Sequence, residues 1–235
     1  MAERAPVIAV DGPSGAGKGT LCARLARRLG WQLLDSGALY RLVALDALRT
    51  ATPLDAAEAL EALARELDIR FEVDDGSGRD AGHRVFLRGD DVSLEIRSDA
   101  VSQGASRVAA LQRVRDALVD RQRAFRRAPG LVADGRDMGT VVFPDADLKV
   151  FLDASAEERA RRRYKQLIDK GLDANLRDLF ESIRDRDVRD RTRAVAPLRP
   201  AADAITLDST AVDADGVFEA VLAQVRRRGL APAPD

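Results

Sequence analysis

The chain has 235 residues and a formal net charge of −1, and its 46% hydrophobic and 33% charged residues are typical of a globular protein rather than a disordered one. No apolar run approaches the ~20 residues that span a bilayer, so we expect no membrane partner. The single cysteine and single histidine exclude an intramolecular disulfide and a multi-cysteine or histidine-rich metal cluster. The first residues carry no secretory signal, so we expect a cytoplasmic protein, and the near-zero net charge argues against nucleic acid as a partner.

Short apolar runs alternate with segments of helical periodicity along the chain. Such alternation predicts an α/β fold, with a five-stranded parallel sheet that has helices on both faces. Residues 69–94 differ, because two alternating runs there flank a stretch of Gly, Asp and Ser, a pattern typical of a small antiparallel insertion. The length fits one domain over residues 1–235. In chain order, strands are predicted at 7–10, 31–34, 131–133, 150–152 and 204–207, and helices at 20–29, 39–49, 54–67, 105–127, 156–193 (broken near Gly171) and 217–228.

A glycine-rich segment links the first predicted strand to the first predicted helix and matches a phosphate-binding loop. Glycines let backbone N–H groups turn toward a phosphate, and the N-terminus of the following helix adds its positive dipole end. Lys18 is expected to reach the β- and γ-phosphates, and Gly19-Thr20 after the lysine is the form found in nucleoside monophosphate kinases. The residues predicted to bind ATP in this loop are Gly12, Pro13, Ser14, Gly15, Ala16, Gly17, Lys18, Gly19 and Thr20.

Other nucleotide-binding classes lack their motifs in this chain. No Gly-x-Gly-x-x-Gly fingerprint of a dinucleotide-binding fold occurs. Asn175 is the only asparagine and Leu176 follows it, so the guanine-reading Asn-Lys-x-Asp of GTPases is absent, as is the His-Arg-Asp of protein kinases. Two classes remain open at this point: phosphoryl transfer to a small acceptor, and ATP hydrolysis that drives motion.

Three further polar segments are candidates for the acceptor side. Residues 35–41 and 134–140 follow predicted strands at their carboxyl ends, where doubly wound sheets bind ligands. Residues 186–193 are dense in arginine and aspartate. Mixed charge also suits a solvated helix face, which we expect for Arg184, Asp187 and Arg189 as readily as a binding role.

Together these segments resemble bacterial cytidylate kinases. The resemblance is strongest at 11–22, 34–41, 133–144 and 191–197, and it covers nearly the whole chain, including the antiparallel insertion. It implies a P-loop kinase fold in which a mobile lid covers about 156–193 and an NMP-binding region covers about 36–115, with the β insertion at about 69–94. The implied reaction transfers the γ-phosphoryl group of ATP to CMP or dCMP in the presence of Mg²⁺. The implied partners are therefore ATP and CMP or dCMP, and we expect a monomer.

The resemblance also implies roles for individual side chains, carried over position by position. The residues around the acceptor phosphate are Ser36, Arg41, Arg136 and Arg193. Those that contact cytosine are Ser106, Arg115 and Asp137, with Tyr40 as an aromatic ring beside the base, and those that contact ribose are Arg186 and Asp190. The metal contacts are Thr20, directly or through water, and Asp134. The lid arginines are Arg159, which binds ATP, and Arg163. The catalytic set is Lys18, Arg136, Arg163 and Arg193.

The residues themselves leave other functions open. UMP, AMP or a small metabolite such as shikimate could replace CMP as the acceptor of a P-loop kinase. In a different class, an RNA-binding ATPase would use the arginines of 159–193 as contacts to the nucleic-acid backbone. The acidic residues interleaved among those arginines cancel much of their field, which disfavours RNA.

Overall fold

The computed structural model describes residues 4–73, 83–169 and 171–230, and the chain divides into two compact units. It passes from the first unit to the second after Ser36 and returns at Gln122, so the second unit is Gly37–Arg121. Each unit has its own sheet. Part of the predicted insertion, residues 74–82, lies outside the described residues.

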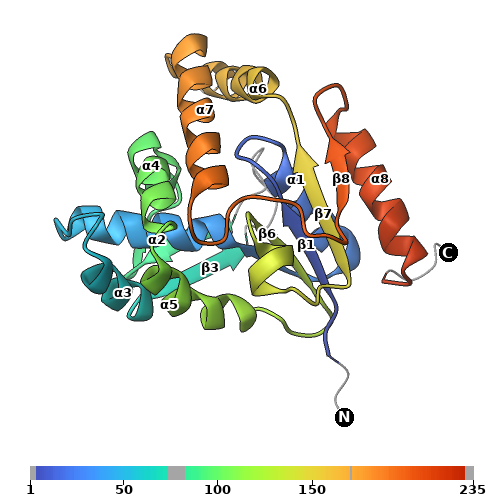
Figure 1. The fold of residues 1–235 in the computed structure, drawn as a ribbon, viewed down its shortest axis with the longest axis horizontal. Coiled ribbons are helices and arrows are strands. Elements are labelled where there is room, and N and C mark those ends of the chain that lie inside the picture. The colour runs from blue at the N-terminus through green and yellow to red at the C-terminus, as the bar shows by residue number, and fades with distance from the viewer. Residues whose placement is uncertain (1–3, 74–82, 170, 231–235) are drawn as a thin grey trace. The chain divides into compact units, whose positions relative to one another are not determined.

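The first unit contains a five-stranded parallel sheet, which confirms the predicted α/β fold (Figure 1). β1 is the central strand: β6 and β7 pair with its two edges, and all five of its residues are buried. Burial on both faces explains why Val7–Val10 is an uninterrupted apolar run. Across the sheet, the strands are β2 (Gln32–Asp35), β6 (Leu131–Gly135), β1 (Val7–Asp11), β7 (Leu148–Asp153) and β8 (Ile205–Asp208).

Helices α1 (Lys18–Leu29) and α8 (Ala214–Arg227) pack against the sheet of the first unit. Leu25 of α1 and Val221 of α8 are fully buried in one core with Ile8 of β1. Burial of each such side chain contributes about 1.5–3 kcal/mol, so this core holds α1, and with it the loop that precedes α1, in place.

Two further helices of the first unit, α6 (Ala156–Asp169) and α7 (Leu176–Thr192), pack against each other (Figure 1). The predicted break near Gly171 is confirmed: Gly171 has a φ of +72°, and Asn175 caps α7 by accepting from the backbone N–H of Arg177 at 2.9 Å. In the described part of the chain, no helix combines the length and apolar character needed to cross a membrane.

The second unit contains a three-stranded antiparallel sheet, as predicted for the insertion. The buried carboxylate of Asp46 on the first helix of this unit accepts from Nε and Nη2 of Arg88, at 3.1 and 2.8 Å, and so ties the end of β4 to that helix. The elements are α2 (Ser36–Arg49), α3 (Ala57–Arg65), β3 (Ile69–Val73), β4 (His83–Leu87), β5 (Asp90–Asp91), a short 3₁₀ helix (Glu95–Arg97), α4 (Asp99–Val108) and α5 (Gln112–Arg123).

The single helix predicted at 105–127 is wrong, because two helices occupy this region. α4 starts at Asp99, where the Ser98 side chain caps it by accepting from the N–H of Val101, and it ends at Val108. α5 begins only at Gln112. No glycine or proline marks the break between them, so the sequence offers no local stop signal at this point.

Gly12→Ala should destabilise the first unit. The φ of Gly12 is +150°, and a Cβ at this position would lie 1.9 Å from the backbone oxygen of Leu152 in β7. Since β1 and β7 would have to separate, we expect the free energy of unfolding to fall by roughly 2 kcal/mol or more, measured by urea denaturation.

The matched control is Gly19→Ala, seven residues further along the same segment. A Cβ there meets only Oδ2 of Asp134, at an ordinary 3.7 Å, so this variant should keep or slightly raise stability. Equal losses in the two variants would contradict this account of Gly12.

Candidate active site

The phosphate loop folds back on itself between β1 and α1. Gly17 caps α1 in the left-handed conformation, with a φ of +97°, which directs the first turn of α1 toward the loop. Lys18 is the first residue of α1, and its buried Nζ donates to the backbone oxygen of Pro13 at 2.9 Å. This hydrogen bond spans the loop from Lys18 back to Pro13, so the buried ammonium group lies against the loop backbone.

The Lys18 ammonium is only partly compensated by negative charge. Burial lowers its pKa below the ordinary 10.5, the positive charge of Arg136 lowers it further, and the Asp134 carboxylate works in the opposite direction. Oδ1 of Asp134 lies 3.9 Å from Nζ. A desolvated cation of this kind attracts a polyanion, which is what a triphosphate would supply.

All five strands of the parallel sheet have an aspartate at or next to their carboxyl end. Because the strands are parallel, these carboxylates lie at one edge of the sheet, the same edge as the phosphate loop. The predicted segments 35–41 and 134–140 begin with two of these aspartates, but the sequence did not indicate the whole row. The residues are Asp35 (β2), Asp134 (β6), Asp11 (β1), Asp153 (β7) and Asp208 (β8).

Thr20 and Asp134 offer two oxygen groups for a divalent cation. Thr20 is exposed on the first turn of α1, and Oδ2 of Asp134 faces the same turn, 3.7 Å from the position of a Cβ on Gly19. Carboxylate and hydroxyl oxygens suit Mg²⁺, which keeps several waters and otherwise takes phosphate oxygens. No cluster of three or more acidic, histidine or cysteine side chains able to hold a metal occurs in the described part of the chain. The donor set thus fits a magnesium ion that arrives with a nucleotide.

Asp11 was not among the predicted site residues, yet it holds the turn that follows β6. Its Oδ1 accepts from the N–H of Met138 and its Oδ2 from the N–H of Gly139, both at 2.8 Å. This one-turn π-helical segment, Met138–Val142, was also missed by sequence reasoning. Burial raises the pKa of Asp11 to about 7, although the two N–H donors act to lower it. Asp11 therefore fixes the backbone directly after Arg136 and Asp137.

Five predicted acceptor residues meet in one charged cluster of the first unit. Nε of Arg136 donates to Oδ2 of Asp190 at 3.1 Å, and Nε of Arg186 lies 4.0 Å from the same oxygen. Nη2 of Arg193 lies 3.8 Å from Oδ1 of Asp137. Burial acts to raise the pKa of Asp190, but the surrounding arginines hold it below its usual value. Three guanidinium groups thus face two carboxylates, and the cluster has an excess of positive charge.

Ser36, at the start of α2, makes a buried hydrogen bond within the first unit. Its Oγ donates to Oε1 of Gln122 at 2.7 Å, and both side chains are almost completely buried. Gln122 was not predicted from the sequence. Its partner is 86 residues away along the chain, so no local pattern could have revealed it.

The other predicted cytosine and phosphate contacts belong to the second unit. Tyr40, Ser106 and Arg115 are all buried there, on α2, α4 and α5. The Cζ of Arg115 lies 5.8 Å from the centre of the Tyr40 ring, and its Nη1 donates to the oxygen of Ala109 at 3.2 Å. The structure thus brings Tyr40 and Arg115 together; Arg41, on α2, is partly buried.

Arg159 of α6 connects the phosphate loop to α7, through Ser14 and Asp187. Its Nη1 donates to the backbone oxygen of Ser14 at 3.0 Å, and both terminal nitrogens bind the carboxylate of Asp187. Its Nε donates to the oxygen of Ala154 at 2.9 Å, so the guanidinium group is held on three sides. Arg163, one helical turn further along α6, is partly buried.

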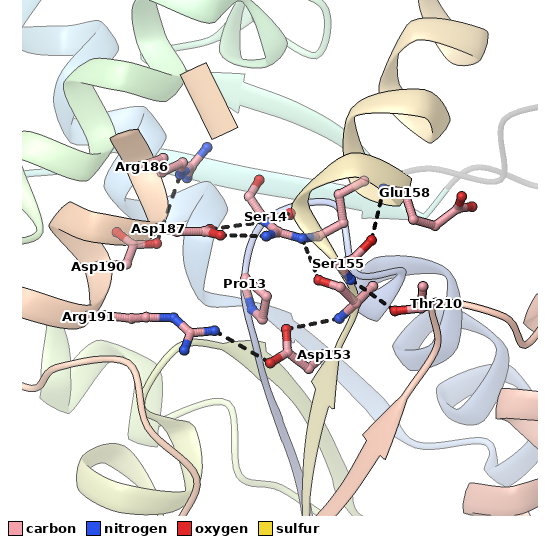
Figure 2. Close-up of polar contacts among 12 residues, drawn as sticks. Pro13, Ser14, Asp153, Ser155, Glu158, Arg186, Asp187, Asp190, Arg191 and Thr210 are labelled. Atoms are coloured by element: carbon pink, nitrogen blue, oxygen red, sulfur yellow. Dashed lines mark hydrogen bonds and ion pairs between the residues drawn. The ribbon is translucent and has the colours of Figure 1, made fainter. Parts of the chain in front are cut away.

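Two further arginines, one on α7 and one on α6, make contacts near Arg159. Arg191 of α7 donates to Oδ2 of Asp153 at the end of β7, at 3.4 Å (Figure 2). Arg162 of α6 is turned instead toward Ser209 and Glu158, to which it donates at 3.2 and 3.0 Å. Of Arg159 and Arg162, therefore, Arg159 is the one that donates to the phosphate loop.

Asp11→Asn should change how stability depends on pH. The pKa of Asp11 is about 7 in the folded chain against 3.8 as the ordinary value. Between these values the folded state retains a proton that the unfolded state releases, so the wild type loses stability as pH rises from about 4 to about 7. Asparagine has no such proton, and the unfolding free energy of wild type minus variant should fall over this range, measured by urea denaturation at several pH values.

Asp208→Asn is the matched control, because Asp208 ends β8 of the same sheet and its hydrogen bonds from the hydroxyl and N–H of Thr210 hold its pKa below the ordinary 3.8. For this variant the difference should not fall between pH 4 and pH 7. A wild-type-minus-variant difference for Asp11→Asn that stayed flat from pH 4 to pH 7 would contradict the raised pKa.

Asp187→Asn should destabilise the folded chain by leaving the Arg159 charge buried without its carboxylate. Loss of one partner of a buried pair costs about 3 kcal/mol, and Arg159 is only 2% exposed. If phosphates of ATP can take the place of the carboxylate, saturating ATP should shrink the difference in Tm between variant and wild type. Glu181→Gln serves as the control, since it breaks an exposed pair with Arg177. Equal Tm losses in the two variants would refute a special role for Asp187.

Comparison with known proteins places the chain in a family. The model of the cytidylate kinase family matches residues 8–227. A cytidylate kinase of Aeromonas hydrophila is 59% identical over 228 residues, which are 97% of each chain, and one of Pseudomonas aeruginosa is 60% identical over 95% of this chain and 96% of its own. A solved structure from Thermus thermophilus covers 95% of this chain and 99% of its own, with 21% identity and a TM-score of 0.44. Because the family model and these relatives extend over nearly the whole sequence, this chain belongs to the cytidylate kinase family.

Proposed function

We propose that this chain transfers the γ-phosphoryl group of ATP to the phosphate of CMP or dCMP, forming ADP and CDP or dCDP. The observation that carries the proposal is the pairing of two cationic sites in one unit. One is the phosphate loop with buried Lys18, and the other is the cluster of Arg136, Arg186 and Arg193. A kinase with a nucleotide acceptor needs one such site for each set of phosphates.

On the donor side, the loop and Lys18 would bind the β- and γ-phosphates of ATP. Arg159 sits beside the loop through its bond to Ser14 and so would reach the same phosphates, with Arg163 on the next turn of α6. Mg²⁺ would be held by Thr20 and Asp134, and when bound it supplies positive charge to the phosphate oxygens. These residues would position the γ-phosphoryl group and balance its charge.

On the acceptor side, Arg136, Arg193 and Arg41 would bind the phosphate of CMP, together with Ser36. Asp190 and Arg186 would contact the ribose. Asp190 already fixes Arg136 at 3.1 Å, so the guanidinium group is oriented before a nucleotide arrives. No general base is required, because the attacking phosphate oxygen is already anionic near neutral pH, its second pKa being about 6. Catalysis then rests on positioning and electrostatic stabilisation.

Asp137 and Arg115 would read the base, with Ser106 and Tyr40 beside it. A carboxylate accepts a hydrogen bond from the amino group of cytosine, whereas uracil presents a carbonyl oxygen at the same position. Asp137 is buried, at 2% exposure, so the mismatch with uracil would leave two acceptors opposed without water between them. This chemistry supports CMP over UMP as the acceptor.

We also propose that the enzyme works as a cytoplasmic monomer, without a nucleic-acid or membrane partner. The net charge of −1 argues against a nucleic-acid partner. Several arginines of α6 and α7 are matched by acidic side chains: Arg159 binds Asp187, Arg162 binds Glu158 and Arg177 binds Glu181. Such pairing weakens the field that an RNA-binding ATPase would need.

An acceptor panel tests the proposed reaction. Release of ADP from ATP should be fast with CMP and dCMP, and much slower with UMP, AMP and shikimate, in a coupled assay with each acceptor in turn. RNA should neither stimulate ATP turnover nor bind in a salt-dependent manner. Turnover that favours AMP or shikimate, or that depends on RNA, would contradict the proposal.

Asp137→Ala should narrow the preference for CMP over UMP. The substitution also removes a carboxylate that lies 3.8 Å from Arg193, but any effect on phosphate binding applies to both nucleotides and cancels in the ratio of their kcat/KM values. A lost base contact is worth roughly 1–3 kcal/mol, so we expect this ratio to drop about 5- to 150-fold. Asp215→Ala, which removes an 82% exposed carboxylate, is the control. An unchanged ratio in Asp137→Ala would clear Asp137 of any role in reading the base.

A further inference from the structure

One hydrogen bond joins the two points at which the chain passes between its units. Ser36 is the last residue of the first unit before the second begins, and Gln122 is the first residue after the second ends. Ser36 Oγ donates to Gln122 Oε1 at 2.7 Å, with 3% and 1% of the two residues exposed. Since water has almost no access to this pair, each polar atom depends on protein or ligand groups for its hydrogen bonds.

A serine hydroxyl has one proton, and this limits what Ser36 can do. A phosphate of CMP offers only acceptors near neutral pH, so Ser36 must donate to bind it. In the structure, however, that proton is directed to Gln122. Ser36 cannot donate its one proton to both the glutamine and a phosphate at full strength.

A glutamine side chain can resolve this conflict, because its amide carries both an acceptor and a donor. With Oε1 toward Ser36 it accepts the hydroxyl proton. With the amide turned over, its Nε2–H donates to Ser36 Oγ, and the hydroxyl proton is released toward a phosphate. A buried donor or acceptor left without a partner costs stability, which favours the orientation that matches each state.

We propose that Gln122 is a positioning residue for the acceptor phosphate. It accepts a hydrogen bond from Ser36 when no CMP is bound. It donates to Ser36 Oγ when the serine hydroxyl donates to the phosphate of CMP. The inference rests on the proposed function, in which Ser36 contacts that phosphate.

The backbone around Gln122 is fixed, as this role requires. Arg123, the next residue, donates from Nε to the oxygen of Val142 at 3.1 Å and from Nη2 to the oxygen of Val141 at 3.3 Å. These oxygens belong to the turn whose N–H groups Asp11 holds. The end of α5 is thus attached to the turn that follows Arg136 and Asp137, and only the amide of Gln122 needs to rotate.

Gln122→Glu separates the two orientations, because a carboxylate has the size of the amide but can only accept. It would continue to accept the hydrogen bond from Ser36 and could not donate to Ser36 Oγ. We expect the Kd of CMP, measured by titration calorimetry, to rise about tenfold. The Kd of cytidine, which has no phosphate, should stay within about twofold, and the Kd of ATP should not change. A general distortion of the fold would weaken cytidine as well.

Further variants complete the test. In a Ser36→Ala background, adding Gln122→Glu should change the Kd of CMP by less than about twofold, because the serine through which it acts is gone. Should Gln122→Glu fail to fold, the wild type still gives a result: the side-chain amide signal of Gln122, assigned in ¹⁵N-labelled protein by its absence from Gln122→Met, should shift when CMP binds and stay in place when cytidine binds. Gln112→Glu, an exposed glutamine on the same helix, is the matched control and should bind CMP as the wild type does.

The outcomes separate the two claims. An unchanged Kd of CMP in Ser36→Ala would remove Ser36 from the acceptor site and would count against that part of the proposed function. A raised Kd in Ser36→Ala, with unchanged CMP binding in Gln122→Glu or, should that variant not fold, an amide signal of Gln122 that CMP leaves in place, would overturn the role of Gln122 alone. Equal loss of CMP and cytidine binding would likewise overturn it.

Discussion

Lys18 is a charged amine held away from water beside other positive groups, and the arrangement of the first unit follows from this constraint. Its Nζ donates to the loop backbone at 2.9 Å, and Oδ1 of Asp134 lies 3.9 Å away. Arg136 and Arg186 both act to lower its pKa. Phosphates would relieve the repulsion among these groups, so part of the binding energy for a nucleotide is already stored in how the folded chain places its charges.

Two aspartates near this charge have different roles, Asp11 at the end of β1 and Asp190 on α7. Asp11 accepts from the N–H groups of Met138 and Gly139, and so fixes the turn that follows Arg136. Asp190 binds Arg136 from α7. The donor loop follows the central strand β1 directly. The acceptor residues Arg136 and Asp137 follow β6, and Asp11 of β1 holds the turn after them, so both sites are attached to β1. The aspartate row at this edge therefore sets positions as much as it balances charge.

The sequence revealed those features that depend on local pattern, and missed those that depend on distant partners. The apolar run Val7–Val10 predicted a buried strand because both faces of β1 are covered, and the glycines predicted the phosphate loop because few other residues fit its backbone. Asp11 and Gln122 have partners 127 and 86 residues away, so no spacing rule could identify them. From the sequence, Asp187 could equally be a solvated charge; the structure shows that it binds Arg159, which in turn contacts the loop. An aspartate that ends a buried strand was nevertheless a usable signal for Asp11, as it was for Asp134.

The titration of Lys18 tests most directly whether its ammonium group is desolvated in the free protein and stabilised by bound phosphates. The chain has four lysines, so ¹³Cε labelling gives four signals, and Lys18→Arg identifies the one that belongs to Lys18. Without nucleotide, Lys18 should titrate well below the ordinary 10.5, and saturating ATP should raise its pKa because the phosphates favour the charged form. An ordinary pKa in the free protein, or a lowered one that ATP leaves unchanged, would contradict the account.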